Sequence, residues 1–204
     1  EKAKDFPMVD AKTRASKEYK QYKEDNNVEY VLRTSEAQDI KDLADWVLNP
    51  KSEYGSDIVR ALLDNPIALK EQPAIAELHG HMFKGKADLI TLDINGQYVI
   101  IDLKTTGSNP SDINIYRMRD FGYDSQCYLY KELFGMDFKF IFFGKKQKVN
   151  ESGEIYYDIE EITPSDQTIE SGKMAVMNAL ANYDKFFGEG ATHDVRKSYT
   201  RRVI

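Results

Sequence analysis

Two strands and a tight turn follow one another in the stretch Lys86-Ala-Asp-Leu-Ile-Thr-Leu-Asp-Ile-Asn-Gly-Gln-Tyr-Val-Ile-Ile-Asp-Leu-Lys104. Asn95-Gly96 lies between two largely apolar runs. This pair predicts a β-hairpin with a type I′ turn, because both central residues of that turn need a positive φ, which Asn and Gly adopt at little cost. The two flanking strands should therefore pair side by side in the centre of a sheet.

Three polar side chains should converge on one face of this hairpin. Side chains two apart in a strand share a face, so Asp102 and Lys104 point the same way while Leu103 points to the opposite layer. Asp88 needs only to lie on that face of the neighbouring strand to join them. Because Ile100-Ile101 marks a buried strand, an ionisable pair at its end requires a partner or a role.

Composition fits one ordinary α/β domain in a reducing setting. The chain has 204 residues, of which 41% are hydrophobic and 12% aromatic. Its single cysteine, Cys127, excludes an intramolecular disulfide, and no Cys/His cluster has the spacing of a structural zinc site. No apolar run resembles a signal peptide or a membrane span. We therefore expect a cytoplasmic protein with no membrane partner, bacterial or phage-encoded.

The net charge of −6 argues against a protein that binds nucleic acid with its whole surface. A metal-dependent site is compatible with this charge, because bound cations invert the local sign. Lysines and arginines cluster locally at 84–86, 117–119, 145–148 and 196–202.

Hydrophobic periodicity places the remaining elements. Helical spacing of apolar residues predicts helices over 34–48, 56–63, about 119–134 and 165–187, with a further helical region beginning near 112. Alternating or continuous apolar runs predict strands over 67–80, 138–143 and 154–162, in addition to the hairpin.

The resulting order, αα-β-ββ-α-β-β-α, predicts an α/β fold with a central mixed sheet and helices on both sides. We expect an N-terminal arm with a loose helix over 1–30, a single domain over 31–192 and a basic tail over 193–204. The phosphate-cradling motifs G-x-G-x-x-G and G-x-x-x-x-G-K-[ST] are absent, which argues against a dinucleotide or P-loop fold.

The polar cluster has the composition of a site for phosphodiester hydrolysis. Mg²⁺ or Mn²⁺ prefers oxygen ligands and keeps several waters, so two carboxylates and a backbone carbonyl suffice. Asp88 and Asp102 fit as ligands, with the carbonyl of Leu103 as a third. Lys104 could orient or deprotonate the attacking water, or hold the scissile phosphate.

Three ordered motifs resemble those of a known family. Gly85-Lys-Ala-Asp88, then Ile101-Asp-Leu-Lys-Thr-Thr106, then Gln126-x-x-x-Tyr130 are similar to the PD-(D/E)xK nuclease superfamily in its RecB-type branch. Within that branch the chain is most similar to RecE-like, phage-type exodeoxyribonucleases. The resemblance covers residues 70 to 190 and implies a restriction-endonuclease-like core.

The resemblance also implies roles for individual residues. It makes Asp88 and Asp102 the metal-binding acids, Lys104 the catalytic lysine and Gln126 and Tyr130 a supporting pair. Residues at i and i+4 share a helix face, so this pair could position DNA or the metal-bound water; alternatively, Tyr130 is core and Gln126 a surface amide. Glu71 matches a glutamate often found on the preceding strand and could lie near the metal, or be an ordinary exposed residue.

One family feature is missing. RecB-type nucleases commonly carry a histidine ligand on an upstream helix, and residues 1–70 contain none. Either that element precedes Glu1 in a longer protein or Glu71 takes its place. His79 and His81 are alternatives, although solvent or strand-edge roles are favoured, and His193 lies in the polar tail and is expected to take no part.

The implied activity is a Mg²⁺-dependent 5′–3′ exonuclease that processes linear double-stranded DNA ends for recombination or repair. An annealing protein or recombinase as partner, and a ring-shaped homo-oligomer, are implied in the same way. Alternatives are a restriction-type endonuclease, an inactive DNA-binding or assembly protein, and a small-molecule phosphoesterase on another fold.

Two aromatic residues are candidates for contact with DNA. Tyr116 and Phe121 lie beside Arg117 and Arg119, and could stack on a frayed base while the arginines contact phosphates. Such residues also commonly pack a helix onto a sheet, and both interpretations stay open.

Overall fold

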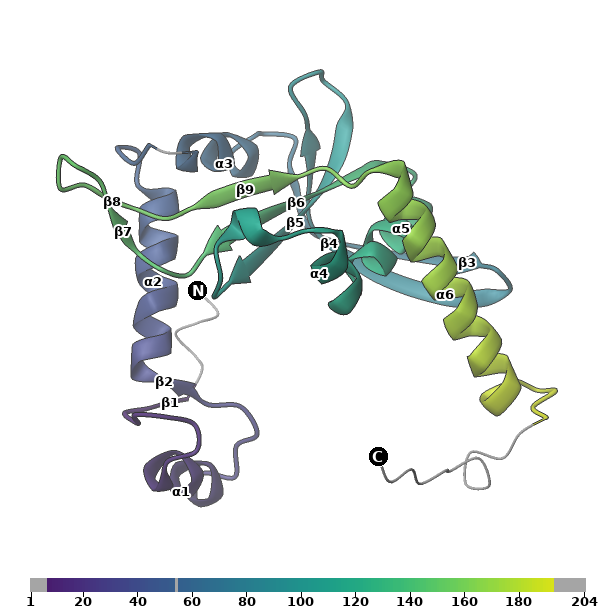
Figure 1. Ribbon diagram of the computed structural model, residues 1–204, viewed down its shortest axis with the longest axis horizontal. Coiled ribbons are helices and arrows are strands. Elements are labelled where there is room, and N and C mark those ends of the chain that lie inside the picture. Colours follow the sequence, from purple (N-terminus) through teal and green to yellow (C-terminus); the bar gives the residue numbers. More distant parts are fainter. Residues whose placement is uncertain (1–6, 54, 193–204) are drawn as a thin grey trace. The chain divides into compact units, whose positions relative to one another are not determined.

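The computed structural model describes residues 7–53 and 55–192 (Figure 1). The predicted tail 193–204, with His193, and the first part of the predicted arm lie outside these residues. The chain forms two compact units, which are described separately below. Unit 1 comprises Glu1–Asp64, Thr105–Pro110 and Phe143–Ile159, and unit 2 comprises Asn65–Lys104, Ser111–Phe142 and Glu160–Ile204.

Unit 1 contains three helices and two pairs of very short strands among its described residues. The helices are α1 (Lys17–Asp25), α2 (Thr34–Leu48) and α3 (Ser56–Leu63), and α2 and α3 agree with the predicted ranges. Strands β1 (Met8–Val9) and β2 (Leu32–Arg33) pair in parallel, and β7 (Lys148–Val149) pairs antiparallel with β8 (Ile155–Tyr156). The predicted strand over 154–162 is therefore broken into β8 and a separate strand, β9.

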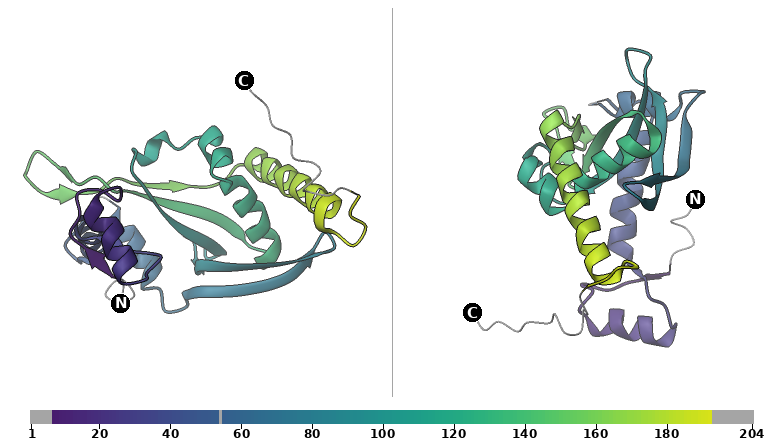
Figure 2. Two further views of the ribbon diagram at one scale, coloured as in Figure 1. Left: turned by 90° about the horizontal axis from the view of Figure 1, so that it is seen from below. Right: turned by 90° about the vertical axis from the view of Figure 1, so that its right-hand side faces the viewer.

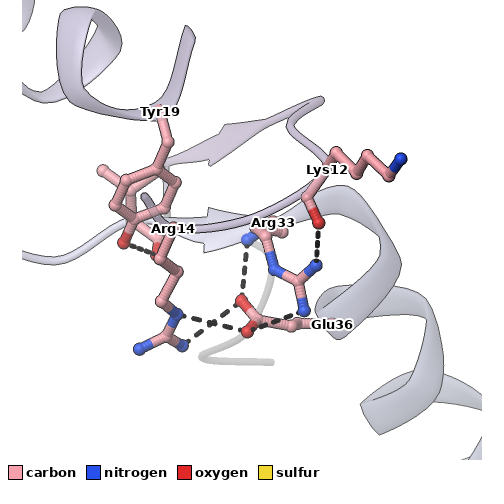
Figure 3. A network of polar contacts seen from close by, with 6 residues as sticks. Lys12, Arg14, Tyr19, Arg33 and Glu36 are labelled. Atoms are coloured by element: carbon pink, nitrogen blue, oxygen red, sulfur yellow. Dashed lines mark hydrogen bonds and ion pairs between the residues drawn. The ribbon is translucent and has the colours of Figure 1, made fainter. Parts of the chain in front are cut away.

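A charged network fixes the start of α2 (Figure 3). The Glu36 carboxylate accepts hydrogen bonds from the Arg14 and Arg33 guanidinium groups, and also from the Arg33 backbone N–H. Arg33 donates in addition to the carbonyl of Lys12 at 2.8 Å. A glutamate in the first turn also suits the positive end of the helix dipole. This network ties the chain preceding α1 to the first turn of α2.

A five-stranded sheet crosses unit 2 in the order β3-β4-β5-β6-β9. The strands are β3 (Leu69–Leu78), β4 (His81–Leu92), β5 (Tyr98–Thr106), β6 (Asp137–Gly144) and β9 (Ile159–Ile162), and the last residues of β5 and β6 and the first of β9 belong to unit 1. Strands β3 and β4, and β4 and β5, pair antiparallel. This mixed sheet flanked by helices confirms the predicted α/β class.

The central hairpin is confirmed, but its predicted type I′ turn is wrong. Gly96 has a φ of 76°, whereas Asn95 does not have a positive φ. The Asp93 side chain explains the difference, because its carboxylate accepts the N–H groups of Asn95 and Gln97, each at 2.9 Å. Asx-type bonding of this kind organises a turn without a positive φ at the following residue.

The helices of unit 2 are α4 (Ile115–Asp120), α5 (Tyr123–Phe134) and α6 (Asp166–Phe187), with a short 3₁₀ turn, η2, over Pro110–Asp112 that starts in unit 1. Gly122, with a φ of 67°, separates α4 from α5. Helix α5 packs on β3 and β4, and α6 packs on α5 (Figure 2). No helix in the described part of the chain is long and apolar enough to span a membrane.

Small residues let these layers approach closely. A Cβ on Gly172 of α6 would lie 2.0 Å from the Asp124 carbonyl oxygen of α5, and one on Gly85 of β4 would lie 3.0 Å from the Leu133 side chain. The core beneath α5 includes Ile90, Ile100, Cys127, Phe138, Phe140 and Phe142. Cys127 is fully buried, and burial, followed by the charge of Asp124, raises the pKa of its thiol to about 12.

Candidate active site

The β4–β5 register brings the two predicted acids together. Leu89 pairs with Ile101 and Ile90 with Ile100, so continuing the register by one residue places Asp88 opposite Asp102. Residues directly opposite in an antiparallel pair project from the same face. The Leu103 N–H donates to Asp88 Oδ2 at 3.0 Å, which holds the Asp88 carboxylate against β5.

Asp102 is the most enclosed group of the site, with 3% of its surface exposed. Gln126 Nε2 on α5 donates to Asp102 Oδ1 at 2.5 Å, and Oδ2 forms an ion pair with the Lys104 ammonium. Burial raises the pKa of the Asp102 carboxyl and outweighs the opposing effect of Lys104; nearby Asp88 raises it further. Asp102 Oδ2 is buried, and apart from its ion pair with Lys104 it accepts no hydrogen bond from the described residues.

Lys104 contacts the Asp102 carboxylate and two aromatic rings. Its Nζ is 5.4 Å from the ring centroid of Tyr123 and 5.8 Å from that of Phe140. Both distances are within the range of cation–π attraction. Tyr123 was not among the predicted site residues, although its place three residues before Gln126 puts both on one side of α5, and this spacing could have identified it.

Gln126 and Tyr130 occupy different places. Gln126 binds Asp102 directly, as described above. The Tyr130 hydroxyl instead donates to the backbone carbonyl of Lys86 at 3.0 Å, and its ring packs edge-on against Phe138 at a centroid distance of 5.7 Å. Tyr130 therefore fixes α5 to β4 two residues before Asp88, and Gln126 fixes α5 to Asp102.

Glu71 lies beside Asp88 in an unusual backbone conformation. Lys70 pairs with Leu89 and Gln72 with Ala87, so Glu71 falls opposite Asp88 on β3. Its φ is 55°, a region that costs L-residues energy and that concentrates at functional sites. Its carboxylate forms an exposed ion pair with Lys86, and this hydrogen bond raises the pKa of the Lys86 ammonium.

The two described histidines bind groups on α5 and α6. His79 Nε2 is hydrogen-bonded to the Tyr128 hydroxyl at 2.6 Å, and His81 Nε2 lies 3.2 Å from an Asp184 carboxylate oxygen. His81 also meets the Tyr183 ring edge-on at a centroid distance of 5.7 Å. These contacts fix the β3–β4 turn to the helices.

The donor set fits a hard divalent cation that keeps most of its waters. No group of three or more His, Cys, Asp or Glu side chains within residues 7–53 and 55–192 is arranged to hold a metal ion. Mg²⁺ is usually bound by one or two carboxylates together with substrate phosphates. Asp88 and Asp102 supply such a pair, and a cation bound there would share the Asp102 carboxylate with the Lys104 ammonium.

Comparisons with known proteins point to one nuclease superfamily. The model of the PD-(D/E)XK nuclease superfamily matches residues 5–201. A crystal structure from Eubacterium rectale, named "Putative exonuclease", superposes with a TM-score of 0.53 and 15% identity over 92% of this chain and 71% of that chain. The structure of SSO0001 gives a TM-score of 0.33 and 23% identity, over 69% of this chain and 68% of the other. No curated protein matches.

The superfamily match covers nearly all of the sequence, and the sheet carries a D-x-K triplet opposite a second aspartate. The chain belongs to the PD-(D/E)XK nuclease superfamily.

Proposed function

We propose that this chain is a Mg²⁺-dependent deoxyribonuclease that degrades linear double-stranded DNA from its 5′ ends. The observation that carries the proposal is the convergence of Asp88, Asp102 and Lys104 on one face of the sheet, with Gln126 bound to Asp102. Mn²⁺ is a plausible substitute for Mg²⁺, since both prefer oxygen ligands.

Each side chain then has a role in the hydrolysis. The Asp88 and Asp102 carboxylates, with the Leu103 carbonyl, would hold the cation, which supplies charge neutralisation and a more acidic water when bound. Lys104 donates to the scissile phosphate or orients the attacking water, and the Tyr123 ring limits where its ammonium can move. Gln126 keeps the Asp102 carboxylate in one orientation, while Tyr130 sets the distance between α5 and β4. Glu71 is a candidate third ligand if its carboxylate leaves Lys86.

Exonuclease rather than endonuclease action is supported by the name of the Eubacterium rectale neighbour and by the motif resemblance to RecE-like enzymes. The same resemblance supports a role in recombination or repair, an annealing protein or recombinase as partner, a ring-shaped homo-oligomer and action in the cytoplasm of a bacterium. These finer statements are part of the proposal.

Digestion of labelled DNA tests the proposal. Linear duplexes carrying a label at either the 5′ or the 3′ end, and a covalently closed circle, are incubated with Mg²⁺ and either the wild type or Asp102→Ala. We expect rapid release of the 5′ label, an intact circle and no release by the variant. Cutting of the circle would favour a restriction-type endonuclease, and early release of the 3′ label would reverse the polarity.

A second candidate is a DNA-binding protein without turnover. The ion pairs of Glu71 with Lys86 and of Asp102 with Lys104 favour it, because each engages an acid that a cation would need. Lys104→Ala separates the two functions, with Lys139→Ala as a matched control: each lysine pairs with an acid, and each side chain is 23% exposed. A nuclease should lose about 10²- to 10⁴-fold in rate with Lys104→Ala alone. Binding without cleavage by the wild type would support the second candidate.

A further inference from the structure

Three aromatic rings lead from the core of unit 2 to its surface beside Lys104. Phe140 on β6 is fully buried, its ring centroid lies 5.3 Å from that of Tyr123, and Tyr123 in turn stacks on Phe121 at 5.5 Å with an interplanar angle of 29°. We call these three neighbouring rings, of Phe140, Tyr123 and Phe121, the aromatic ladder. Phe121 is 63% exposed, so a further ring can stack on the outer end of the aromatic ladder.

The ladder passes directly beneath the proposed catalytic lysine. The Lys104 ammonium lies over the Tyr123 ring, one step below Phe121. Single exposed apolar side chains are common and need no explanation. Phe121 differs from most of them because it continues a stack that begins under a residue we place at the scissile phosphate.

The local backbone holds Phe121 in this position. Phe121 ends α4, and Gly122 follows with a φ of 67°, a conformation that turns the chain into α5. The Asn114 side chain accepts the N–H groups of Tyr116 and Arg117 at the start of α4. A platform fixed at both ends loses little entropy when a ligand stacks on it.

The C-terminal end of α4 is fixed from a second helix. Arg119 Nε donates to Ser171 Oγ of α6 at 2.9 Å, and Ser171 Oγ donates to Asp124 Oδ2 of α5 at 2.8 Å. Met118, which is buried in the core cluster, anchors α4 in the core. Three neighbouring contacts therefore restrain the helix that presents Phe121.

The last turn of α4, which precedes Phe121, is basic. Arg117 lies one helical turn before Phe121, and both arginines fall in the last turn of α4. An exposed aromatic ring on a helix whose last turn is basic is a combination that suits single-stranded nucleic acid, in which bases stack on aromatic residues. Bases inside an intact duplex are covered on both faces by their neighbours, and the terminal pair of a blunt end offers one face only, so an unpaired base can reach this ring most readily.

We propose that Phe121 is a stacking site for an unpaired nucleobase of the strand being cut. The proposal rests on the deoxyribonuclease function above. It gives the enzyme a preference for frayed or single-stranded ends, because those ends offer a free base at no cost in unpairing.

Binding of oligonucleotides that carry 2-aminopurine at the end tests this site. The fluorophore is quenched when it stacks, and affinity is measured in metal-free buffer, so that no cleavage occurs, with the protein titrated to concentrations high enough for the weak binding expected there. The variants are Phe121→Ala, Phe121→Leu and Phe121→Trp. Phe187→Ala is the matched control, since Phe187 is 65% exposed and packs on Tyr183 at a centroid distance of 5.7 Å.

We expect Phe121→Ala and Phe121→Leu to weaken binding of duplexes with unpaired ends about fivefold or more, to abolish the quenching and to leave blunt-duplex binding nearly unchanged. Phe121→Trp should retain both signals, and Phe187→Ala should match the wild type. Equal affinity and quenching in Phe121→Ala and the wild type would overturn the stacking site while the nuclease activity stands.

Equal loss of blunt and unpaired substrates would also overturn it, by indicating a general apolar contact. A wild type that neither binds nor degrades DNA would overturn the deoxyribonuclease function itself. The two failures are distinguishable, because this one is seen in the wild type alone and the other only in the comparison with the Phe121 variants.

Discussion

Glu71 has a positive φ and lies opposite Asp88. Its backbone conformation and its carboxylate therefore affect stability separately. The left-handed region costs an L-residue about 1–2 kcal/mol, whereas glycine adopts it freely. The Glu71–Lys86 pair is exposed and contributes little to stability. Natural sequences retain such strain where the side chain has a function.

We predict that Glu71→Gly unfolds with about 1 kcal/mol more free energy than Glu71→Ala, because both variants lose the carboxylate and only glycine relieves the backbone. Urea denaturation measures the difference. Asn27→Gly is the control, because asparagine tolerates its φ of 48° and little gain is expected there. An alanine variant as stable as the glycine variant would contradict the assignment of strain.

Asp102 links stability to pH through its raised pKa. A carboxyl whose pKa is raised by folding binds its proton more tightly in the native state. Its contribution to stability is therefore present below the ordinary carboxyl pKa and is lost as the pH rises through the raised one. At neutral pH the buried carboxylate is a cost to the metal-free protein.

We predict that Asp102→Asn stabilises the metal-free protein at neutral pH by about 0.5–2 kcal/mol and loses this advantage in acid, because asparagine is neutral and isosteric. Thermal melts across pH measure the effect. Mg²⁺ should raise the melting temperature of the wild type and not of the variant, since a ligand of the native state stabilises it by mass action. A wild type more stable than the variant at neutral pH without metal would contradict the prediction.

The residues of the site were predictable to different degrees. The convergence of Asp88, Asp102 and Lys104 followed from strand periodicity and a hairpin signal, which depend on nearby residues alone. The different partners of Gln126 and Tyr130 could not be predicted in this way. Helical spacing shows that the two residues share a face of α5, but it does not show which residues that face contacts. The backbone conformation of Glu71 leaves no trace in composition or periodicity.

At the scale of elements, Gly172 sets the spacing of α5 and α6. Glycine inside a helix normally costs about 0.5–1 kcal/mol relative to alanine. Here a Cβ would lie 2.0 Å from the Asp124 carbonyl oxygen and 2.9 Å from the Ser125 nitrogen, and backbone atoms cannot move as a side-chain tip can. The close approach also keeps Ser171 within reach of Asp124 and Arg119.

We predict that Gly172→Ala lowers the free energy of unfolding by at least about 2 kcal/mol, because overpacking forces the two helices apart. Chemical denaturation measures the loss. Gly190→Ala is the control, with no atom within 4 Å of its added Cβ and an expected change within about 0.5 kcal/mol. A stabilised Gly172→Ala would show that helix propensity, and not packing, governs this position.

The long elements were predicted best. Helix α6 begins one residue after the predicted start, with Ser165 as its cap, and the strands of the sheet follow the predicted alternation. The two-residue strands β1 and β2 were not predicted, because so short a segment carries no periodicity. The turn around Asp93 shows the same limit, since a side-chain bond and not the Asn-Gly pair determines its form.

For the whole molecule, a net charge of −6 restricts how the chain can hold DNA. A polyanion is attracted only where cations are concentrated, and each phosphate contact adds about 0.9 to the salt dependence of the binding constant. The proposed site places two carboxylates where the scissile phosphate would lie. A divalent cation between them removes this repulsion.

We predict weak binding of linear duplex DNA in metal-free buffer and stronger binding when Ca²⁺ is added, because Ca²⁺ occupies carboxylate sites. The slope of log affinity against log salt should have a magnitude below about 5, well short of the value of about 10 reached by a protein that makes many phosphate contacts. Fluorescence anisotropy measures both. Asp102→Asn should lose most of the Ca²⁺ effect, and affinity independent of Ca²⁺ in the wild type would contradict the prediction.

The lone thiol of the chain has a practical consequence. Cys127 is adjacent to Gln126 in sequence, is sealed in the core and ionises only near pH 12, so a thiol-specific reagent can react with it only after unit 2 has opened. The rate of alkylation is therefore an intrinsic reporter of opening beneath the active centre. No label need be engineered into the protein. A slower alkylation of this sulfur in the presence of a cation or of DNA would measure how far each ligand suppresses the opening of unit 2.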